Sequence, residues 1–461
     1  MTDAQHSSVP GRIDLLAQSV ASGRTSYEAS VRQALDVAAS TAAAHVFSRL
    51  YPEQALAAAR AADAAHRSGR TPGPLAGVPV SIKDLFDVAG DVTCAGSVVC
   101  SDASAAVSDA PVVARLRAAG AAIVGRTNMT EFAFSGVGVN PHFGTPRNPA
   151  DPDTPRVPGG SSSGAAVSVA LGAAYAALGT DTGGSIRIPA ALCGLVGFKS
   201  SQTRVPGAGA FPLSRTLDSV CAMAHTVSDC LRLDAVIADL PLQAAPVALA
   251  GRRFLVADGL GLEDLAPEVA AAFENALNRL SAAGAHIVRQ RWPHLDRAPA
   301  INGMPSFAAI EGYAIHRERL EKLRARFDPR VAARLETGAP VLAADYLAQL
   351  AARHAWANEV DRTLDAFDAL LLPTVPLLAP TIAELVHDDA RFFEVNRLLL
   401  RNPTMVNLFD GCAFSLPCQA PGELPVGLML AASNGRDAAL ACVALSVESA
   451  LRQHTVSGME A

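Results

Sequence analysis

The chain has 461 residues, of which 50% are hydrophobic and 18% charged, and its net charge is −6. This composition supports a large buried core and excludes long disordered segments. Because no run of like charge occurs, nothing in the sequence favours binding to nucleic acid or to an anionic membrane.

The cysteines and histidines indicate a reducing compartment and no metal. None of the eight cysteines has CxxC spacing, and the eleven histidines form no HxxxH pair and no Cys/His cluster. We therefore expect free thiols, a cytoplasmic location, no metal and no cofactor. Residues Met1 to Ser8 lack the basic and apolar regions of a signal peptide. The most apolar stretch, residues 164–179, is too short to span a bilayer and is expected to be a buried helix.

Helical and strand patterns alternate along the first third of the chain. Residues 12–69 have apolar positions at helical spacing. The β-branched run Val78–Ile82 predicts a strand that leads into Lys83. Residues 110–119 then predict a helix and residues 121–124 a strand. This alternation favours an α/β fold.

The rest of the chain continues without repeats or long linkers. Residues 135–160 are rich in Gly, Pro, Asn and Asp and are expected to form a loop. Residues 265–365 are mostly helical by pattern, and residues 369–373 and 425–430 predict later strands. We expect one domain over residues 1–461.

Two Gly/Ser loops are the strongest candidates for chemistry, Pro158–Gly164 and Gly179–Arg187. Glycine lets the backbone approach a ligand, and successive N–H groups can converge on an anion. A serine at the end of such a loop would lie beside an oxyanion hole. Each loop alone is also compatible with a tight turn or a phosphate cradle, although neither contains a known phosphate-binding motif.

The match of Gly160–Gly164 to G-x-S-x-G does not identify Ser162 as a nucleophile. That motif follows a strand, whereas residues 146–158 contain five prolines. A serine nucleophile needs a base, and neither loop contains a histidine. His142, the nearest, is expected to be structural. Lys83 is a better candidate, because burial at a strand end would lower its pKa, although a surface ion pair is the alternative.

Four segments in order resemble the motifs of the amidase signature family. They are Gly77–Val88, Gly125–Ala133, Pro158–Gly164 and Gly179–Gly194, and the step of 24 residues from Ser161 to Ser185 matches the family's spacing. Weaker similarity covers nearly the whole chain, with departures at Ser163, at Lys199–Ser201 and at Cys221.

The resemblance implies a fold and a set of roles. The expected fold is α/β, a central mixed sheet flanked on both faces by helices. Residues 1–70 would form an N-terminal helical segment, 71–225 would carry the catalytic motifs, and 265–400 would be a variable helical region that shapes the substrate site. Ser185 would be the nucleophile, and Ser161, after a cis peptide bond, would pass its proton to Lys83. The resemblance also implies supporting residues: backbone N–H groups of Thr182, Gly183, Gly184 and Ser185 in the oxyanion hole, Asp181 and Arg187 as braces of the loop, and Met129, Phe132 and Phe134 in the substrate pocket.

The implied activity is hydrolysis of a small-molecule amide through an acyl-enzyme, releasing ammonia or an amine. One alternative is deamination of an amino-substituted unsaturated acid. Another is the glutaminase subunit of a tRNA amidotransferase, although residues 330–338 match that subunit's Arg-Arg-Ile…Gly stretch poorly. A binding protein without activity is a third alternative, opposed by the intact Lys83, Ser161 and Ser185.

Other residues are open candidates for shaping the pocket. They are Phe307, Tyr313 and His316 in the helical region, and Arg391, Phe392, Phe393 and Arg397, which could recognise a carboxylate or an aromatic ring. Apart from a small-molecule substrate, the only partner that we consider is a second copy of the chain.

Overall fold

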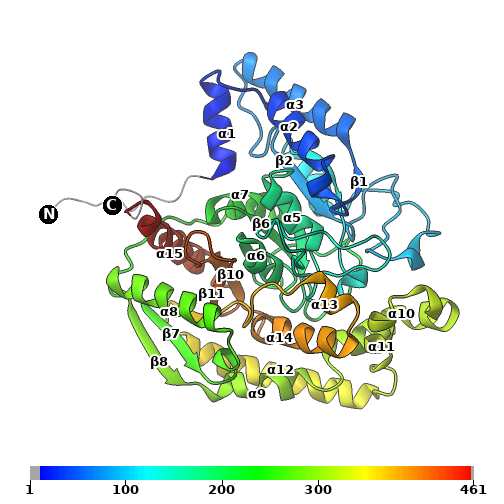
Figure 1. Ribbon diagram of the computed structural model, residues 1–461, viewed down its shortest axis with the longest axis vertical. Helices are drawn as coiled ribbons and strands as arrows, with labels where there is room; N and C mark the ends of the chain where they lie inside the picture. The colour runs from blue at the N-terminus through cyan, green and yellow to red at the C-terminus, as the bar shows by residue number, and fades with distance from the viewer. Residues whose placement is uncertain (1–10, 458–461) are drawn as a thin grey trace.

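The computed structural model describes residues 11–457 of the chain (Figure 1). The prediction that no signal peptide is present concerns Met1 to Ser8 and lies outside the described residues. Among the described helices, none is both long and hydrophobic enough to cross a membrane.

Within the described residues, eleven strands form one mixed sheet in the order β1-β3-β2-β4-β6-β5-β10-β11-β9-β7-β8. Six neighbouring pairs are antiparallel, and four are parallel. In chain order the strands are Phe47–Leu50, Pro79–Lys83, Ala122–Thr127, Ala176–Asp181, Val196–Lys199, Ser219–Ala224, Arg253–Asp258, His286–Arg291, Ala369–Pro373, Cys412–Pro417 and Gly427–Ala432.

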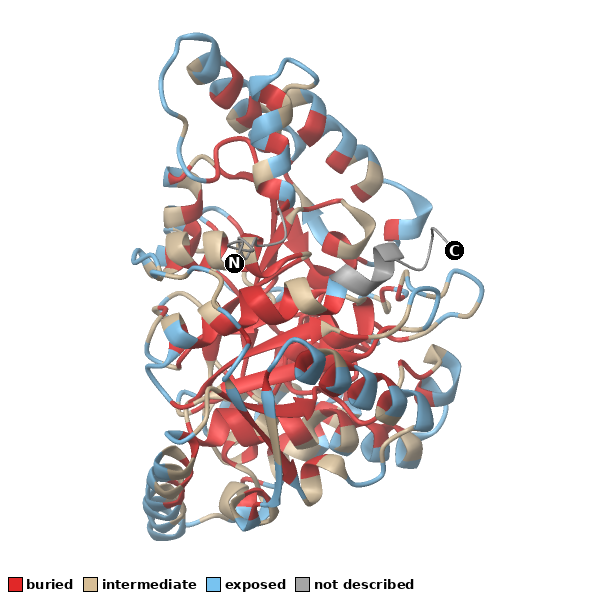
Figure 2. Cartoon of the chain, turned by 90° about the vertical axis from the view of Figure 1, so that its left-hand side faces the viewer, coloured by how far each residue is buried: buried red, intermediate tan, exposed pale blue. Residues whose placement is uncertain are grey.

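The predicted α/β fold with helices on both faces is confirmed, and the side-chain alternation of the strands explains it. In β9, Ala369 and Leu371 belong to one core cluster, whereas Leu370 and Leu372 belong to another. The first cluster includes residues of α7 (Val227–Ala238), α8 (Pro267–Ala282) and α15 (Asp437–Ser457). The second includes residues of α9 (Pro293–Asn302), α12 (Ala343–Leu364) and α14 (Asp389–Leu408). Figure 2 shows the buried sheet at the centre and exposed helix faces outside.

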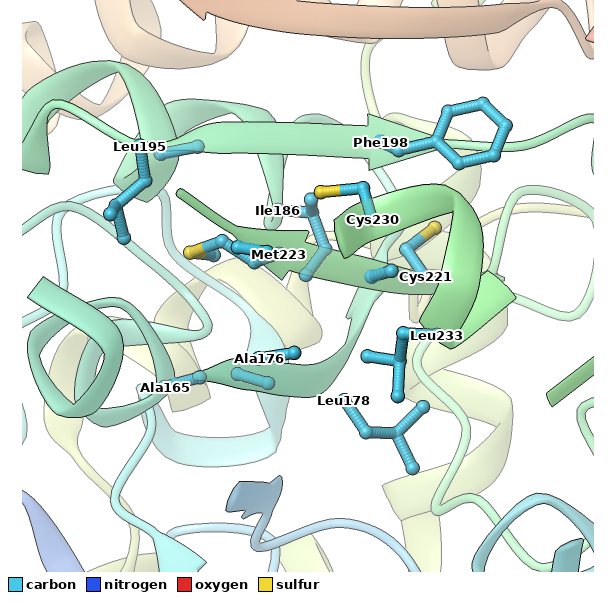
Figure 3. Close-up of a cluster of buried hydrophobic side chains, with 14 of the residues drawn as sticks. Ala165, Ala176, Leu178, Ile186, Leu195, Phe198, Cys221, Met223, Cys230 and Leu233 are labelled. Carbon is cyan, nitrogen blue, oxygen red and sulfur yellow. The ribbon is translucent and has the colours of Figure 1, made fainter. Parts of the chain in front are cut away.

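The central strands β4, β5 and β6 pack through buried apolar side chains of mixed size (Figure 3). Ala176 and Leu178 of β4 and Cys221 and Met223 of β6 are at most 2% exposed. Phe198 of β5 stacks on Phe414 of the neighbouring β10, with ring centroids 4.2 Å apart.

The remaining helices surround this core. They are α1 (Arg12–Ala21), α2 (Tyr27–Ala38), α3 (Pro52–Arg67), α4 (Pro111–Ala118), α5 (Ser163–Leu171), α6 (Arg187–Cys193), α10 (Phe307–Leu323), α11 (Pro329–Glu336) and α13 (Ile382–Val386). Figure 1 shows α1 to α3 at one end of the molecule, whereas α10 and α11 project on another side.

The topology defines where the site lies. Strands β2 and β4 are parallel, so Lys83 and Asp181, their last residues, lie at the same edge of the sheet. Strand β6 is antiparallel to β4, with Ser219 opposite Asp181, so the residues before β6 reach that edge too. The carboxyl ends of parallel strands are where ligands bind in open α/β sheets.

Two sequence predictions about elements were wrong. Residues 164–179 are not one helix: α5 ends at Leu171, the cap residue Gly172 has a left-handed φ of 85°, and β4 begins at Ala176. Residues 12–69, predicted as helical throughout, include β1, whereas residues 265–365 are mostly helical as predicted, with β8 as the one strand. Short apolar runs do not distinguish a buried strand from a buried helix by periodicity. Strands β5, β6, β7 and β10 were not predicted at all.

Candidate active site

Lys83 lies at the buried end of β2 and contacts one of the two loop serines. Its side chain is fully buried. Nζ lies 2.8 Å from Ser161 Oγ and 2.9 Å from Thr180 Oγ1. Burial lowers the pKa of Lys83 to about 7, although the negative charges of Asp218 and Asp181 oppose the shift. A large fraction of this amine is therefore neutral near pH 7 and can accept a proton.

Ser161 belongs to the loop that leads into α5. The Gly160–Ser161 peptide bond is cis, as the resemblance implied. The Ser161 carbonyl accepts the N–H of Thr130 at 3.1 Å. Ser162 N donates to Ser185 O at 3.3 Å, which joins the two Gly/Ser loops. The Ser162 hydroxyl donates to Thr180 O at 3.4 Å, so this hydroxyl faces the backbone of β4.

Asp181 and Arg187 hold the second loop in shape, which is the bracing position that the sequence suggested. Both side chains are fully buried, and Arg187 Nη2 lies 2.9 Å from Asp181 Oδ1. Burial alone would raise the pKa of Asp181, but the Arg187 charge and hydrogen bonds hold it well below its ordinary value. Asp181 also accepts the backbone N–H groups of Gly184 at 2.8 Å and Ile186 at 3.2 Å.

The backbone around Gly184 corrects one expected role. The Gly184 N–H is bound to Asp181 and is not available to an oxyanion, so the expectation for this residue is wrong in this geometry. Gly184 has a φ of 123°, and a Cβ there would lie 2.6 Å from Pro403 Cβ, so only glycine fits. The N–H groups of Thr182, Gly183 and Ser185 have no hydrogen-bond acceptor within the described part of the chain. These three remain available for an oxyanion.

Helix α14 packs on the nucleophile loop through residues that the sequence analysis missed. Thr404 Oγ1 donates to Gly183 O at 3.2 Å. Asn407 Nδ2 donates to Asp181 Oδ1 at 2.9 Å, and Asn407 Oδ1 accepts from Arg187 Nη2 at 2.6 Å. Residues 396, 400, 404 and 407 share one helix face by spacing, which is the only signal that the sequence held.

A cavity of about 90 Å³ opens beside Ser185. The lining comes from the segment around Phe134, the nucleophile loop, the turn at Leu213 and Leu217, and the later helices. The lining residues are Ala133, Phe134, Ser135, Thr182, Gly183, Ser185, Leu213, Leu217, Asn302, Ser306, Ala308, Arg334, Leu400 and Thr404. This mixture of apolar side chains and a few polar groups is typical of a small-molecule site.

Of the three expected pocket residues, only Phe134 lines this cavity. Phe132 packs instead among aromatic rings, with its ring centroid 4.1 Å from that of His316. Met129 is fully buried, and its carbonyl accepts from Asn140 Nδ2. Phe132 and Ala133 both have left-handed φ values, so the backbone turns sharply here and separates neighbouring side chains.

Arg334 of α11 is a cation in the wall of the cavity that the sequence analysis did not single out. Its guanidinium stacks over the Phe134 ring at 3.9 Å and donates to the Phe134 carbonyl. Burial lowers the pKa of Arg334 to about 10, so it stays charged at neutral pH. Within residues 11–457 no carboxylate forms an ion pair with it. It therefore has spare capacity to bind an anion.

The other candidates for substrate recognition do not line the cavity. Arg391 pairs with Glu394 at 2.8 Å, and the Phe392 ring lies under Arg330. None of Phe307, Tyr313, His316, Arg391, Phe392, Phe393 and Arg397 lines the cavity. Among the described residues, no group of histidine, cysteine or acidic side chains is arranged to hold a metal ion.

Comparison with known proteins gives consistent matches. The model of the Amidase family matches residues 29–441. The 2-amino-5-chloromuconic acid deaminase of Comamonas testosteroni is 39% identical over 416 residues, which cover 88% of this chain and 88% of that protein. One subunit of the glutamyl-tRNA(Gln) amidotransferase of Moorella thermoacetica is 34% identical, over 87% of this chain and 88% of that protein.

A solved structure agrees with these relatives. A crystal structure of an amidase superposes with a TM-score of 0.85 at 33% identity, and covers 95% of this chain and 99% of that one. The agreement therefore extends over nearly the whole sheet and its helices.

Proposed function

This chain belongs to the amidase signature family and is a hydrolase of carbon–nitrogen bonds, and we propose that it cleaves a small-molecule amide through a Ser185–Ser161–Lys83 relay. The observation that carries the proposal is the buried Lys83 Nζ, 2.8 Å from Ser161 Oγ, with a pKa of about 7. Ser185 fits the nucleophile because it borders the cavity and its loop is joined to that of Ser161.

In the first half of the reaction, neutral Lys83 accepts the proton of Ser161 as Ser161 accepts the proton of Ser185. The Ser185 oxygen then forms a bond to the substrate carbonyl carbon, and the N–H groups of Thr182 and Gly183 bind the oxyanion. The protonated Lys83 returns its proton through Ser161 to the leaving nitrogen. The C–N bond breaks, and ammonia or an amine departs from an acyl-enzyme.

In the second half, water replaces the amine. Lys83 accepts the water proton through Ser161, and the hydroxide oxygen bonds to the acyl carbon. The proton then returns to Ser185 as the ester bond breaks, which releases a carboxylic acid and restores the resting enzyme. Thr180 assists both halves of the reaction. Neutral Lys83 can donate an N–H to Thr180 Oγ1, and this orientation turns the nitrogen lone pair toward Ser161.

A second candidate is deamination of an amino-substituted unsaturated acid. The relative from Comamonas testosteroni carries that kind of activity in its name, and Arg334 offers this cavity an unpaired cation that suits a substrate carboxylate. Ser185 would add to the carbon that bears the amino group, and the electron pair of the double bond would move into the conjugated carboxyl group. The Ser185 proton would pass through Ser161 and Lys83 to the amino nitrogen, the double bond would re-form, and the C–N bond would break to release ammonia. Water would then release the hydroxy acid.

The free thiols support a cytoplasmic location, as a proposal. All eight cysteines are unpaired in the structure. Disulfides persist mainly in oxidising compartments, so eight reduced cysteines fit a reducing one.

The test compares the wild-type protein with Ser185→Ala on four substrate classes: primary amides, aryl amides, 2-amino-substituted unsaturated acids and glutamine. Release of ammonia or amine is measured. We expect turnover of one of the first three classes by the wild type and none by the variant. Equal turnover by both proteins would overturn Ser185 as the nucleophile, and exclusive turnover of glutamine would favour the amidotransferase role.

A further inference from the structure

We propose that Asp218 is a positioning residue for catalysis, which holds the oxyanion loop through Thr182 and ties that loop to the wall of the substrate cavity. The inference rests on the proposed function of Ser185 and its relay. It concerns a residue that the catalytic steps above do not use.

Asp218 is placed opposite Thr182 by the sheet itself. In the antiparallel pair of β4 and β6, Asp181 faces Ser219, and one further step places Thr182 across from Asp218. The Thr182 hydroxyl donates to Asp218 Oδ1 at 2.5 Å. This bond orients Thr182, whose backbone N–H has no acceptor among the described residues and is a donor for the proposed oxyanion.

The other carboxylate oxygen is held by the turn that precedes β6. Asp218 Oδ2 accepts the N–H groups of Leu213 at 3.0 Å and Ser214 at 3.1 Å. Leu213 and Leu217 line the cavity beside Thr182. One carboxylate therefore connects the oxyanion loop with an apolar wall of the substrate site.

The same turn is anchored to the variable helices. Thr216 N donates to Glu311 Oε2 of α10 at 3.1 Å, and Tyr346 Oη of α12 donates to Glu311 Oε1 at 2.9 Å. The position of the turn, and of Asp218 with it, is thus fixed from both sides. Small errors in the position of an oxyanion donor are costly, because its contribution depends on preorganised geometry.

Asp218 also acts on the base through its charge. The groups that face Lys83 are Asp218, Asp181 and Cys221. Each raises the pKa of Lys83, and Asp218 raises it most. Glu311 is the charged group that faces Asp218 from α10. Removing the Asp218 charge should therefore lower the pH at which Lys83 becomes neutral.

The experiment uses a fluorophosphonate, which reacts with an activated serine and needs the same oxyanion donors. The rate constant of labelling is measured from pH 5 to 9 for the wild type, Thr182→Val, Thr182→Ser and Asp218→Asn. We expect about a tenfold loss for Thr182→Val without a shift of the pH profile, and recovery with Thr182→Ser. For Asp218→Asn we expect a comparable loss, with the acid limb moved to lower pH.

Two controls separate this inference from the proposed function. Thr93→Val removes a threonine hydroxyl that donates to Asp87 Oδ1 at 2.6 Å, and neither residue lines the cavity, so this variant should label at the wild-type rate. Ser185→Ala should not label at all; a wild type that does not label would defeat the proposed function itself. A Thr182→Val rate within twofold of the wild type would overturn the role of Asp218, and this holds even if Asp218→Asn fails to fold.

Discussion

The nucleophile loop and the opposite wall of the cavity differ in how their polar groups are held. In the loop, Asp181, Arg187 and Asn407 saturate one another in a fully buried network. In the wall, Arg334 has no acidic partner among the described residues, and Asn302 Oδ1 has no hydrogen-bond partner there either. The difference indicates that the shape of the nucleophile loop is fixed by hydrogen bonds within the protein, whereas the opposite wall keeps polar groups free to bind a ligand.

The largest effect is expected from the relay. Lys83→Met removes the amine bonded to Ser161 and should lower kcat by about ten-thousand-fold, because members of a relay act as a unit. Steady-state kinetics on the substrate found in the screen measures it. The double variant with Ser185→Ala should be no slower than the slower single variant. Additive losses would show that the two residues act separately.

The pH profile tests the same relay without a mutation. Lys83 must be neutral to accept a proton, and its pKa is about 7. Activity should therefore be full above that pH and fall about tenfold for each unit below it, as kcat/KM reports the free enzyme. A profile that stays flat from pH 5 to 9 would contradict Lys83 as the base.

A break in the buried network of Asp181, Arg187 and Asn407 should lower the stability of the fold. Asp181→Asn leaves the Arg187 charge buried without its partner and should lower the free energy of unfolding by about 3–5 kcal/mol. Urea unfolding followed by circular dichroism measures this loss. The matched control is Glu274→Gln, which breaks the exposed pair with Arg289 and should cost at most about 1 kcal/mol. Similar losses for both variants would contradict the contrast between buried and exposed pairs.

A substitution of Arg334 in the cavity wall should change the affinity for a carboxylate substrate. Arg334→Gln should raise KM for a carboxylate substrate by about ten- to a hundredfold with little change in kcat, since a charge-assisted bond is lost from binding. Arg330→Gln is the control, because Arg330 lies on the same helix but pairs with Asp389 outside the cavity. An equal rise in KM for an uncharged amide would show that Arg334 is structural.

The smallest effect is expected from the contact between His142 and Glu131. His142 Nε2 lies 2.9 Å from the buried carboxylate of Glu131, and this hydrogen bond raises the pKa of His142. Because the pKa of His142 is higher in the folded protein than in the unfolded chain, the hydrogen bond stabilises the fold fully below the ordinary pKa of about 6.5. This stabilisation is lost as the pH rises through the pKa of His142 in the folded protein. His142→Gln should therefore cost below about 1 kcal/mol at pH 5.5 and less at pH 8. Thermal unfolding at the two pH values measures the difference, and a larger loss at pH 8 would contradict the sign.

The sequence predicted the local parts of the site better than their partners. The strand before Lys83 could be predicted because its apolar run is local, and Ser162 could be rejected because prolines precede it. Asn407 could not be predicted, because it meets Asp181 across 226 positions of the chain. The role of Arg334 could not be predicted either, because only the packing of α11 places its guanidinium over the Phe134 ring. The second half of the 164–179 stretch was misassigned because apolar Ala/Gly segments fit both a helix and a strand.

The amino-acid sequence by itself determined the family, the α/β class and the order of the motif-bearing loops, since these depend on residue types at short spacing. Only the tertiary structure decided that Lys83 reaches Ser161, that the N–H of Gly184 is already bound by Asp181, and that Asp218 meets Thr182. Those outcomes depend on strand register and on which helix covers which loop. Register and helix packing are set by the burial of the whole core, which short motifs do not encode.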